Sequence, residues 1–368
     1  MGAFFAREPV LPAAMVLVLL SMLAVPPTTV YLTYIDMPVL MLLFCLMAVI
    51  RELERLKCFL ALGDWVVGRT VKRRSLYLTL VGLCFFLSMA VTNDVALITV
   101  VPFSLSLLHR ARLGEDMIAL VVWETVAANL GSMLTPIGNP QNLYLYSVSG
   151  MSISNFLQLM FPLTAISFVL LMLIGYCHRN DTISVVPIKK DIVQLNWRKI
   201  VICGILFSLC LATVLRVVPN MVCFIVVIVV LAVMDWQALR EVDYRLLATF
   251  SLMFVLVGNI GRLPEIRRVL ASVIGGHEFL AGVLVSQIIS NVPAAMLLSG
   301  FTTAYDKLLL GVNVGGLGTL VASMASLISY RYYGQVKGAQ RWKYLLVFTA
   351  VNIVFLAVLG LASIIESY

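Results

Sequence analysis

Residues 89–103 read MAVTNDVALITVVPF, and they place Thr92, Asn93 and Asp94 in the middle of an otherwise apolar run. A buried carboxylate without partners costs several kcal/mol or takes up a proton. Asp94 therefore needs partners, and Thr and Asn are side chains that satisfy free backbone groups where a helix is interrupted. The stretch predicts a helix that breaks inside a hydrophobic layer.

The composition indicates an all-α polytopic membrane protein. The chain has 368 residues, of which 61% are hydrophobic and 12% charged, whereas a soluble domain has about 25% charged residues. The net charge of +8 does not indicate nucleic-acid binding, because Lys and Arg lie in short loops between apolar segments. About nine transmembrane segments are expected, at 11–25, 37–51, 116–146, 153–177, 197–217, 220–234, 244–262, 309–332 and 342–364.

Two further apolar stretches, 76–110 and 278–306, each have a polar interruption near their middle and are predicted re-entrant hairpins. If both return to the side they entered, 21 of the 26 Lys and Arg residues lie on one side. The positive-inside rule then places the N-terminus in the cytoplasm and the C-terminus outside the plasma or inner membrane. Residues 52–74 and 263–277 are expected to form interfacial amphipathic helices that lead into the hairpins.

The two hairpin interruptions resemble each other. Residues 88–96 align without gaps on residues 286–294, and three further weak matches, the last between 129–139 and 316–326, follow the same order. We expect a duplication with repeats at 1–177 and 197–368, joined by a cytoplasmic linker at 178–196. The repeats have opposite topology in this scheme, and inverted repeats with broken helices are a transporter architecture.

Two predicted spans, 116–146 and 309–332, are expected to be broken helices. The first contains TPIGNPQN at 135–142, with two prolines, a glycine and three amides, which a continuous helix does not tolerate. The second contains VASMAS at 321–326, with small residues and hydroxyls. Free N–H groups at such breaks favour an anion, and Thr, Ser and Asn oxygens suit a small cation. Kinked helices with locally satisfied caps are the structural alternative.

The motifs TNDVAL (92–97), TPIGNPQN (135–142), ISNVPAA (289–295) and GGLGTL (315–320) resemble those of the ion transporter superfamily. This superfamily includes arsenite/antimonite permeases and divalent-anion:sodium symporters of the citrate-transporter type. The resemblance implies a secondary active transporter that moves a small inorganic or organic anion, coupled to Na⁺ or H⁺, by alternating access of hairpin-bearing domains. A Na⁺/H⁺ antiporter and an uncoupled anion channel are the alternatives.

The resemblance also implies site residues. One cation site would comprise Ser88, Thr92, Asn93 and Gly138, with Asp94 as a further candidate; the second would comprise Ser286, Asn291 and small residues near Ala322. The substrate would lie between Asn93 and Asn291, with Thr92, Asn139, Ser290 and Ser323 as further contacts. Na⁺ is the single metal or cofactor implied. The tips T-N-D and S-N-V-P lack the third-position threonine of the symporters and look closer to the arsenite permeases.

Two acids lie within apolar segments. Asp94 can bind sodium, take up a proton or cap a half-helix, and intramembrane carboxylates are functional candidates. Glu124 is expected roughly 16–20 Å from the break near Gly138, at 1.5 Å per residue, which favours a structural or lining role.

The sequence gives no sign of an enzyme. It contains no H-E-x-x-H, G-x-S-x-G or P-loop motif, and its seven cysteines form no C-x-x-C pair. The expected partners are the lipid bilayer and a small anion. The resemblance leaves open a homodimer and a separate ATPase subunit, although no sequence feature indicates the latter.

Overall fold

The computed structural model describes residues 10–67, 72–182 and 195–366. The chain divides into two compact units. Unit 1 comprises Met1–Val49, Pro140–Met151 and Leu206–Gly316, and unit 2 comprises Ile50–Asn139, Ser152–Ile205 and Leu317–Tyr368. The described residues form helices joined by turns, with one isolated β-bridge between Lys72 and Thr182. The predicted all-α polytopic fold is thus confirmed.

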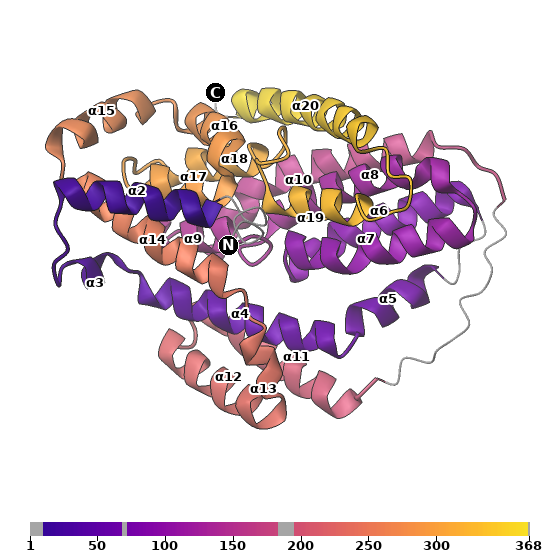
Figure 1. Cartoon of the computed structure of the whole chain (residues 1–368), viewed down its shortest axis with the longest axis horizontal. Coiled ribbons are helices and arrows are strands. Elements are labelled where there is room, and N and C mark those ends of the chain that lie inside the picture. The colour runs from indigo at the N-terminus through magenta and orange to yellow at the C-terminus, as the bar shows by residue number, and fades with distance from the viewer. Residues whose placement is uncertain (1–9, 68–71, 183–194, 367–368) are drawn as a thin grey trace. The chain divides into compact units, whose positions relative to one another are not determined.

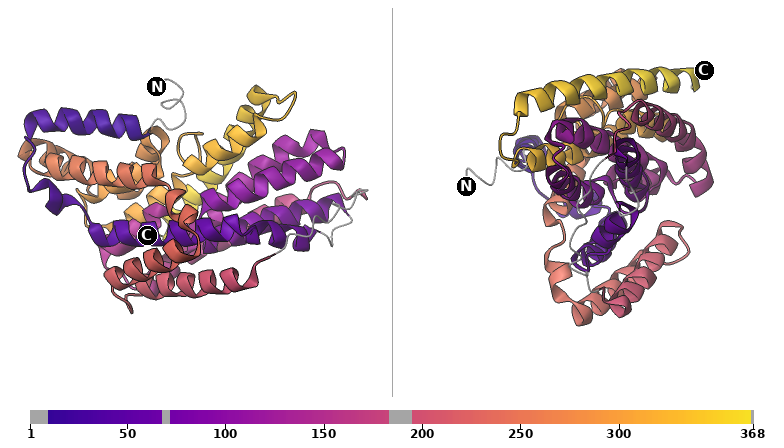
Figure 2. Two further views of the ribbon diagram at one scale, coloured as in Figure 1. Left: turned by 60° about the horizontal axis from the view of Figure 1, so that its bottom comes forward. Right: turned by 90° about the vertical axis from the view of Figure 1, so that its right-hand side faces the viewer.

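Unit 2 is built around the first hairpin, whose helices α6 and α7 pack against each other and against α8. Helix α19 lies on α7 and α8, and the long helix α20, yellow in Figures 1 and 2, packs on α8 and α10. The helices of this unit are α5 (Cys58–Val67), α6 (Arg73–Ala90), α7 (Asn93–Arg110), α8 (Met117–Gly131), α10 (Ile153–Tyr176), α19 (Met324–Tyr333) and α20 (Arg341–Glu366), with 3-10 turns η1 (Gly114–Asp116) and η2 (Ser132–Leu134).

Unit 1 is built around the second hairpin, whose helices α16 and α17 pack against each other and against α18. Helix α9 lies on α17 and α18, and α2 lies along α14 (Figure 1). The helices of this unit are α2 (Val10–Ala24), α3 (Tyr31–Tyr34), α9 (Pro140–Ser149), α12 (Asn220–Met234), α13 (Trp236–Arg240), α14 (Tyr244–Gly261), α15 (Pro264–Ile274), α16 (Glu278–Ile289), α17 (Asn291–Ser299) and α18 (Tyr305–Val314).

The chain passes between the units at the two breaks. Helix α8 belongs to unit 2 and its continuation α9 to unit 1, whereas α18 belongs to unit 1 and its continuation α19 to unit 2. Each unit therefore combines one hairpin with one half of each broken helix. Helices α4 (Met37–Arg55) and α11 (Trp197–Val214) also continue from one unit into the other. The predicted repeats stay a prediction, and residues 183–194 of the predicted linker lie outside the described residues.

Six helices in the described part of the chain are long and apolar enough to cross a membrane, or seven if a bent pair counts as one span. The expected count of about nine is higher for local reasons. Helices α2 and α12 are apolar but short, α4 ends in the charged stretch Arg51–Arg55, and the 309–332 segment is interrupted. One helix of the first hairpin, Arg73–Ala90, is itself of spanning length.

Each predicted interfacial segment contains a helix, and residues 68–71 of the first segment lie outside the described residues. Helix α5 packs against both legs of the first hairpin. Helix α15 meets α16 at an angle of 110°, exposes Val269 and Val273, and carries Arg267 and Arg268. An exposed apolar face beside basic residues is typical of a helix that lies in the membrane interface.

Candidate functional site

The tip of the first hairpin lies at Val91 and Thr92, between α6 and α7. Thr92 has an extended backbone and is the N-cap of α7, because its Oγ1 accepts a hydrogen bond from Val95 N at 3.4 Å. Asp94 follows in the first turn of α7, where the helix dipole favours a negative charge. The N-cap position that the sequence allowed for Asp94 is thus taken by Thr92.

The break of the first broken helix, residues 135–139, lies against this tip. Gly138 O accepts a hydrogen bond from Asn93 N at 3.2 Å, and Thr135 Oγ1 donates to Met89 O at 2.5 Å. Asn139 Nδ2 donates to Ser132 Oγ at 2.7 Å, while Asn139 Oδ1 is buried without a hydrogen-bond partner among the described residues. The tip and the break form one polar region with an unused amide oxygen.

Asn129, near the end of α8, joins this region to the second broken helix. Its Oδ1 accepts hydrogen bonds from Asn93 Nδ2 and Ser323 Oγ, both at 3.0 Å. Its Nδ2 donates to Ser326 Oγ at 3.3 Å. Asn129 and these three partners are at most 5% exposed. We refer to these four side chains as the Asn129 junction. Three chain segments of unit 2 meet here, although each comes from a different part of the sequence.

The tip of the second hairpin, in unit 1, consists of one residue. Ser290 lies between α16 and α17 with φ 76 and ψ 153, a backbone conformation that is strained for any residue except glycine. Its Oγ donates to Asn291 Oδ1 at 3.4 Å. Gln287 Nε2 donates to Gly315 O at 2.8 Å, which ties α16 to the end of α18. A Cβ at Gly316 would lie 2.9 Å from Asn291 Nδ2, so the amide packs directly on this glycine.

Unit 1 contains a link that matches the Asn129 junction. Asn313 Nδ2 of α18 donates to Asn142 Oδ1 of α9 at 2.7 Å. Asn313 follows Asn129 by the same number of positions as Ser326 follows Asn142. In both units, therefore, an amide near the end of the first half of one broken helix holds the start of the second half of the other. This pairing differs from the sequence alignment of 129–139 with 316–326, which places Asn129 opposite Gly316.

Residues 3–308, which contain both hairpins and the first broken helix, match the family described as "Citrate transporter". The chain belongs to the citrate transporter family. An uncharacterized transporter of Methanocaldococcus jannaschii is 33% identical over 294 residues, which cover 78% of this chain and 79% of that protein. The inner membrane protein YbiR of Escherichia coli is 31% identical over 301 residues, which cover 81% and 80%. The silicon efflux transporter LSI3 of Oryza sativa is 32% identical over 143 residues, or 39% of this chain and 29% of that protein.

Membership of the citrate transporter family confirms the predicted resemblance to ion transporter superfamily permeases and identifies an integral membrane transporter. The orientation of the termini stays a prediction.

In this member of the citrate transporter family, the predicted site residues fall into two groups. Those in unit 1 are Ser286, Ser290 and Asn291, and those in unit 2 are Ser88, Thr92, Asn93, Asp94, Gly138, Asn139, Ala322 and Ser323. The expected second cation site and the expected substrate position both draw on residues of the two units, and they stay predictions. Asn129 was missed, because a single amide within an apolar helix carries no local pattern.

Ser88 and Ser286 are both buried, but their hydroxyls are used within their own helices. Ser88 Oγ donates to Phe85 O at 2.9 Å, and Ser286 Oγ donates to Gly282 O at 2.6 Å. A serine that bonds to a preceding carbonyl still has free lone pairs on its oxygen. Each hydroxyl can therefore accept a hydrogen bond or contact a cation while it keeps its present bond.

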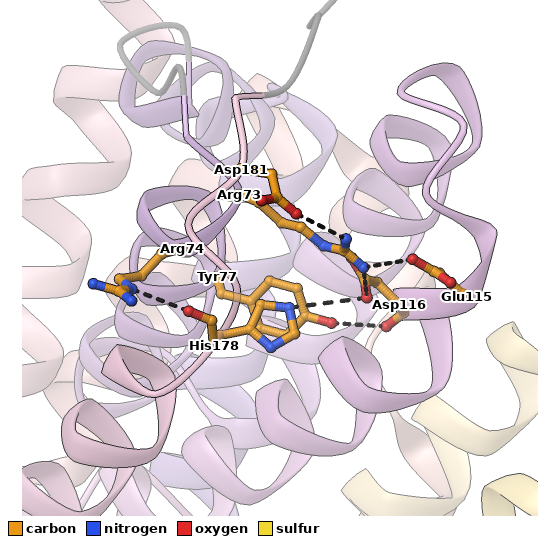
Figure 3. A network of polar contacts seen from close by, with 7 residues as sticks. All are labelled: Arg73, Arg74, Tyr77, Glu115, Asp116, His178 and Asp181. Carbon is orange, nitrogen blue, oxygen red and sulfur yellow. Dashed lines mark hydrogen bonds and ion pairs between the residues drawn. The ribbon is translucent and has the colours of Figure 1, made fainter.

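The base of the first hairpin is held by charges that sequence reasoning also missed. Figure 3 shows the Arg73 side chain directed at Asp116 and Glu115, and the ring of His178 lying over Tyr77. Arg73 N donates to Asp181 O at 2.9 Å. His178 Nε2 lies 3.8 Å from Asp116 Oδ1, whose negative charge raises the pKa of the imidazole. Burial has the larger, opposite effect and lowers the pKa of His178 below its ordinary value. The cluster fixes the starts of α6 and α8 to the segment that follows α10.

Proposed function

We propose that the chain is a secondary active transporter that moves a small inorganic or organic anion, coupled to Na⁺ or H⁺. The observation that supports this most is the Asn129 junction, which brings the starts of α7 and α19 and the 135–139 break to one buried place in unit 2. Family membership supports transport itself, and the junction supports a ligand site at the breaks.

The chemical groups around the Asn129 junction and the 135–139 break suit both an anion and a cation. The N-terminal ends of α7 and α19 carry partial positive charge that favours an anion. The Asn139 Oδ1 oxygen and the Thr92 hydroxyl are oxygen ligands of the kind that hold Na⁺ at broken helices. Asp94 adds a negative charge beside these groups and is the proposed cation ligand of the tip.

The chain path supports alternating access. The chain passes from one unit to the other at the non-helical stretches 135–139 and 315–323, where the backbone can bend, whereas α4 and α11 pass between the units as continuous helices. The residues proposed to bind ligand lie at the same breaks. Ligand binding and domain movement are thereby coupled through the same few residues, as alternating access requires.

The test uses the full-length protein in proteoliposomes with imposed Na⁺ or proton gradients. The anionic probes are citrate, succinate and sulfate. Arsenite and silicic acid, which are largely uncharged near neutral pH, are added as inorganic probes, the latter because one relative is a silicon efflux transporter. We expect one of them to accumulate above its equilibrium level when a gradient is present. Equilibration that ignores both gradients would identify a channel, and Na⁺/H⁺ exchange without any anion would identify an antiporter; either result contradicts the proposal.

The Asp94→Asn substitution distinguishes a role of Asp94 in ion coupling from a purely structural role. The substitution keeps the size of the side chain and removes its charge. We expect the variant to purify as a folded protein, to exchange substrate across the membrane, and to lose gradient-driven accumulation. Unchanged accumulation would show that Asp94 has no part in cation binding.

A further inference from the structure

Glu124 is an acid in the interior of unit 2 that the proposed site does not use. It lies in the middle of α8 and is 0% exposed. Its Oε1 accepts a hydrogen bond from Ser104 Oγ on α7, while its Oε2 is buried without a hydrogen-bond partner among the described residues. A buried carboxyl oxygen without a partner is costly, so the absence of a second donor calls for an explanation.

No positive charge compensates Glu124 within the described part of the chain. Tyr77 and Cys84 of α6 and Tyr344 of α20 are titratable groups close to Glu124, and none of these three is cationic. The neighbouring helix α10 contains no charged residue, and α19 contributes Tyr330 and Tyr333, which pack against Tyr344. The acids of η1 are already held by Arg73.

A metal cation does not fit this place. Hard cations take several oxygen ligands, whereas Ser104 offers a single hydroxyl beside Glu124. The described residues contain no cluster of three or more His, Cys, Asp or Glu side chains suited to a metal ion. A proton, by contrast, needs one oxygen, and Oε2 is free to carry it.

Glu124 is also closer to the site than the sequence suggested. The site reaches back along α8 to Asn129, which is about 7–8 Å from Glu124 at 1.5 Å per residue. Further along α8, Gly131 packs directly on Phe85 O and Ser88 Oγ of the hairpin. On α7, Thr99 Oγ1 lies between Ser104 and the tip in sequence and is likewise buried without a partner. Asn129 on α8 and Thr99 on α7 are therefore polar groups that lie, along their helices, between the level of Glu124 and the tip.

We propose that Glu124 binds one proton in the interior of unit 2 and that gain and loss of this proton accompany each transport cycle. The inference rests on the proposed function and adds to it a proton site that is separate from the cation ligands proposed at the tip. The proton is taken up on a carboxylate oxygen and released from it, with no other bond changed. The position in unit 1 that corresponds to Glu124, by the pairing of Asn129 with Asn313, is Leu308. The site therefore holds one proton in each chain.

Infrared difference spectroscopy tests proton binding without any substrate. Spectra of the purified wild-type protein and of Glu124→Gln are compared from about pH 5 to pH 9 in H₂O and D₂O. We expect a carboxylic-acid C=O band in the wild type that is absent from Glu124→Gln. Ser104→Ala retains the acid but removes the hydrogen bond to Oε1, so the band should persist at a higher frequency. If the wild type shows no such band at any pH, Glu124 is not a proton site.

Proton flux tests coupling. Proteoliposomes that contain a pH-sensitive dye are given citrate, succinate, sulfate, arsenite or silicic acid, and internal pH is followed. We expect anion-dependent proton movement in the wild type, at least a tenfold loss in Glu124→Gln, and retained exchange of the anion. The matched control is Glu278→Gln. Glu278 is also a buried acid whose Oε2 has no hydrogen-bond partner among the described residues, but its Oε1 accepts hydrogen bonds from both Thr302 Oγ1 and Gly276 N, and it lies in the first turn of α16, where the helix dipole favours the charged form.

The two measurements separate the possible failures. An infrared band with unchanged proton-coupled flux in Glu124→Gln would contradict the coupling role and leave the transport function standing. A wild-type protein that moves none of the five probes would contradict the proposed function, while the infrared band alone would still decide whether Glu124 carries a proton.

Discussion

The two hairpins have the same place in their units but are stabilised differently. In unit 2 the legs α6 and α7 have 18 residues each, and the tip is capped by Thr92 and held by Asn129. In unit 1 the legs α16 and α17 have 12 and 9 residues, and the tip is the single strained residue Ser290. The first tip is therefore satisfied by side-chain hydrogen bonds, and the second is maintained against strain by the packing around it.

This difference suggests that the two tips respond to a ligand in different ways. A tip whose amide already has hydrogen-bond partners can exchange one of them for a ligand at low cost. A strained tip stores free energy that ligand binding or domain movement can release. Substitutions at corresponding positions of the two units test these two descriptions.

Glycine-to-alanine substitutions where each hairpin packs on its broken helix are expected to change stability the most. A Cβ at Gly131 would lie 2.0 Å from Phe85 O, and a Cβ at Gly315 would lie 2.9 Å from Ser286 Cβ. We expect Gly131→Ala to lower the free energy of unfolding by about 3 kcal/mol or more, and Gly315→Ala to lower it by less, because α6 must move as a whole. Apparent melting temperatures of the purified proteins measure this order.

The control for both is Gly82→Ala in α6, where a Cβ would meet nothing within 4 Å. It should leave the melting temperature unchanged or raise it slightly, since alanine favours a helix. Equal melting temperatures for Gly131→Ala and Gly82→Ala would mean that the hairpin can move away from α8 without cost.

Alanine substitutions of the amides Asn129 in unit 2 and Asn313 in unit 1 are expected to have the next largest effect on stability. Asn129→Ala leaves Asn93 Nδ2, Ser323 Oγ and Ser326 Oγ without their shared partner, so we expect a loss of about 1–3 kcal/mol in the free energy of unfolding. Asn313→Ala removes one side-chain link, to Asn142, and should cost less. A larger loss for Asn313→Ala would overturn the view that the first tip depends more on hydrogen bonds.

Ser290 and Thr92 should respond to glycine with opposite signs. Ser290→Gly relieves a backbone conformation that is strained for serine, and should raise the free energy of unfolding by about 1 kcal/mol. Thr92→Gly removes a cap from an unstrained residue and should lower it by a few tenths of a kcal/mol. Shifts of the same sign would show that the two tips do not differ in strain.

The smallest effect concerns pH at the base of the first hairpin. Burial lowers the pKa of His178, and Asp116 opposes this in part. The unfolded chain therefore binds the proton more tightly, so the contribution of His178 to stability is complete above its unfolded pKa of about 6.5 and is lost as the pH falls below it. Between pH 8 and pH 5.5, the apparent melting temperature should fall further for the wild type than for His178→Gln. An equal fall in both proteins would show that His178 does not contribute to the pH dependence of stability.

Much of the fold follows from local patterns. The polar residues at 92–94, the prolines at 136 and 140, and the S-N-V-P stretch at 290–293 interrupt apolar helices, and the structure has breaks at each of these places. The breaks were predictable because prolines and polar groups are clustered at these places, whereas the single residues Pro102 and Pro162 lie inside the continuous helices α7 and α10.

What could not be predicted depends on contacts between distant segments. The association of α9 with the second hairpin and of α19 with the first is a matter of packing, and no local pattern carries it. Asn129 acquires its role from Asn93 and Ser323, and Arg73 from Asp116, which are remote in the sequence. The register between the broken helices also differed from the alignment, because the hydrogen bonds of Asn129 and Asn313 define it and the weak sequence match does not.

Asn93 at the tip in unit 2 and Asn291 at the tip in unit 1 are each predicted to contact the transported species. The most direct test is gradient-driven accumulation in proteoliposomes by Asn93→Ala and Asn291→Ala, with whichever of the five probes the wild type accumulates. The matched control is Asn352→Ala in α20, where a buried amide bonds only to Phe348 O of its own helix among the described residues. We predict at least a tenfold loss of accumulation in both tip variants and wild-type accumulation in the control. Full accumulation by Asn93→Ala and Asn291→Ala would contradict the claim and reduce both hairpin tips to structural turns.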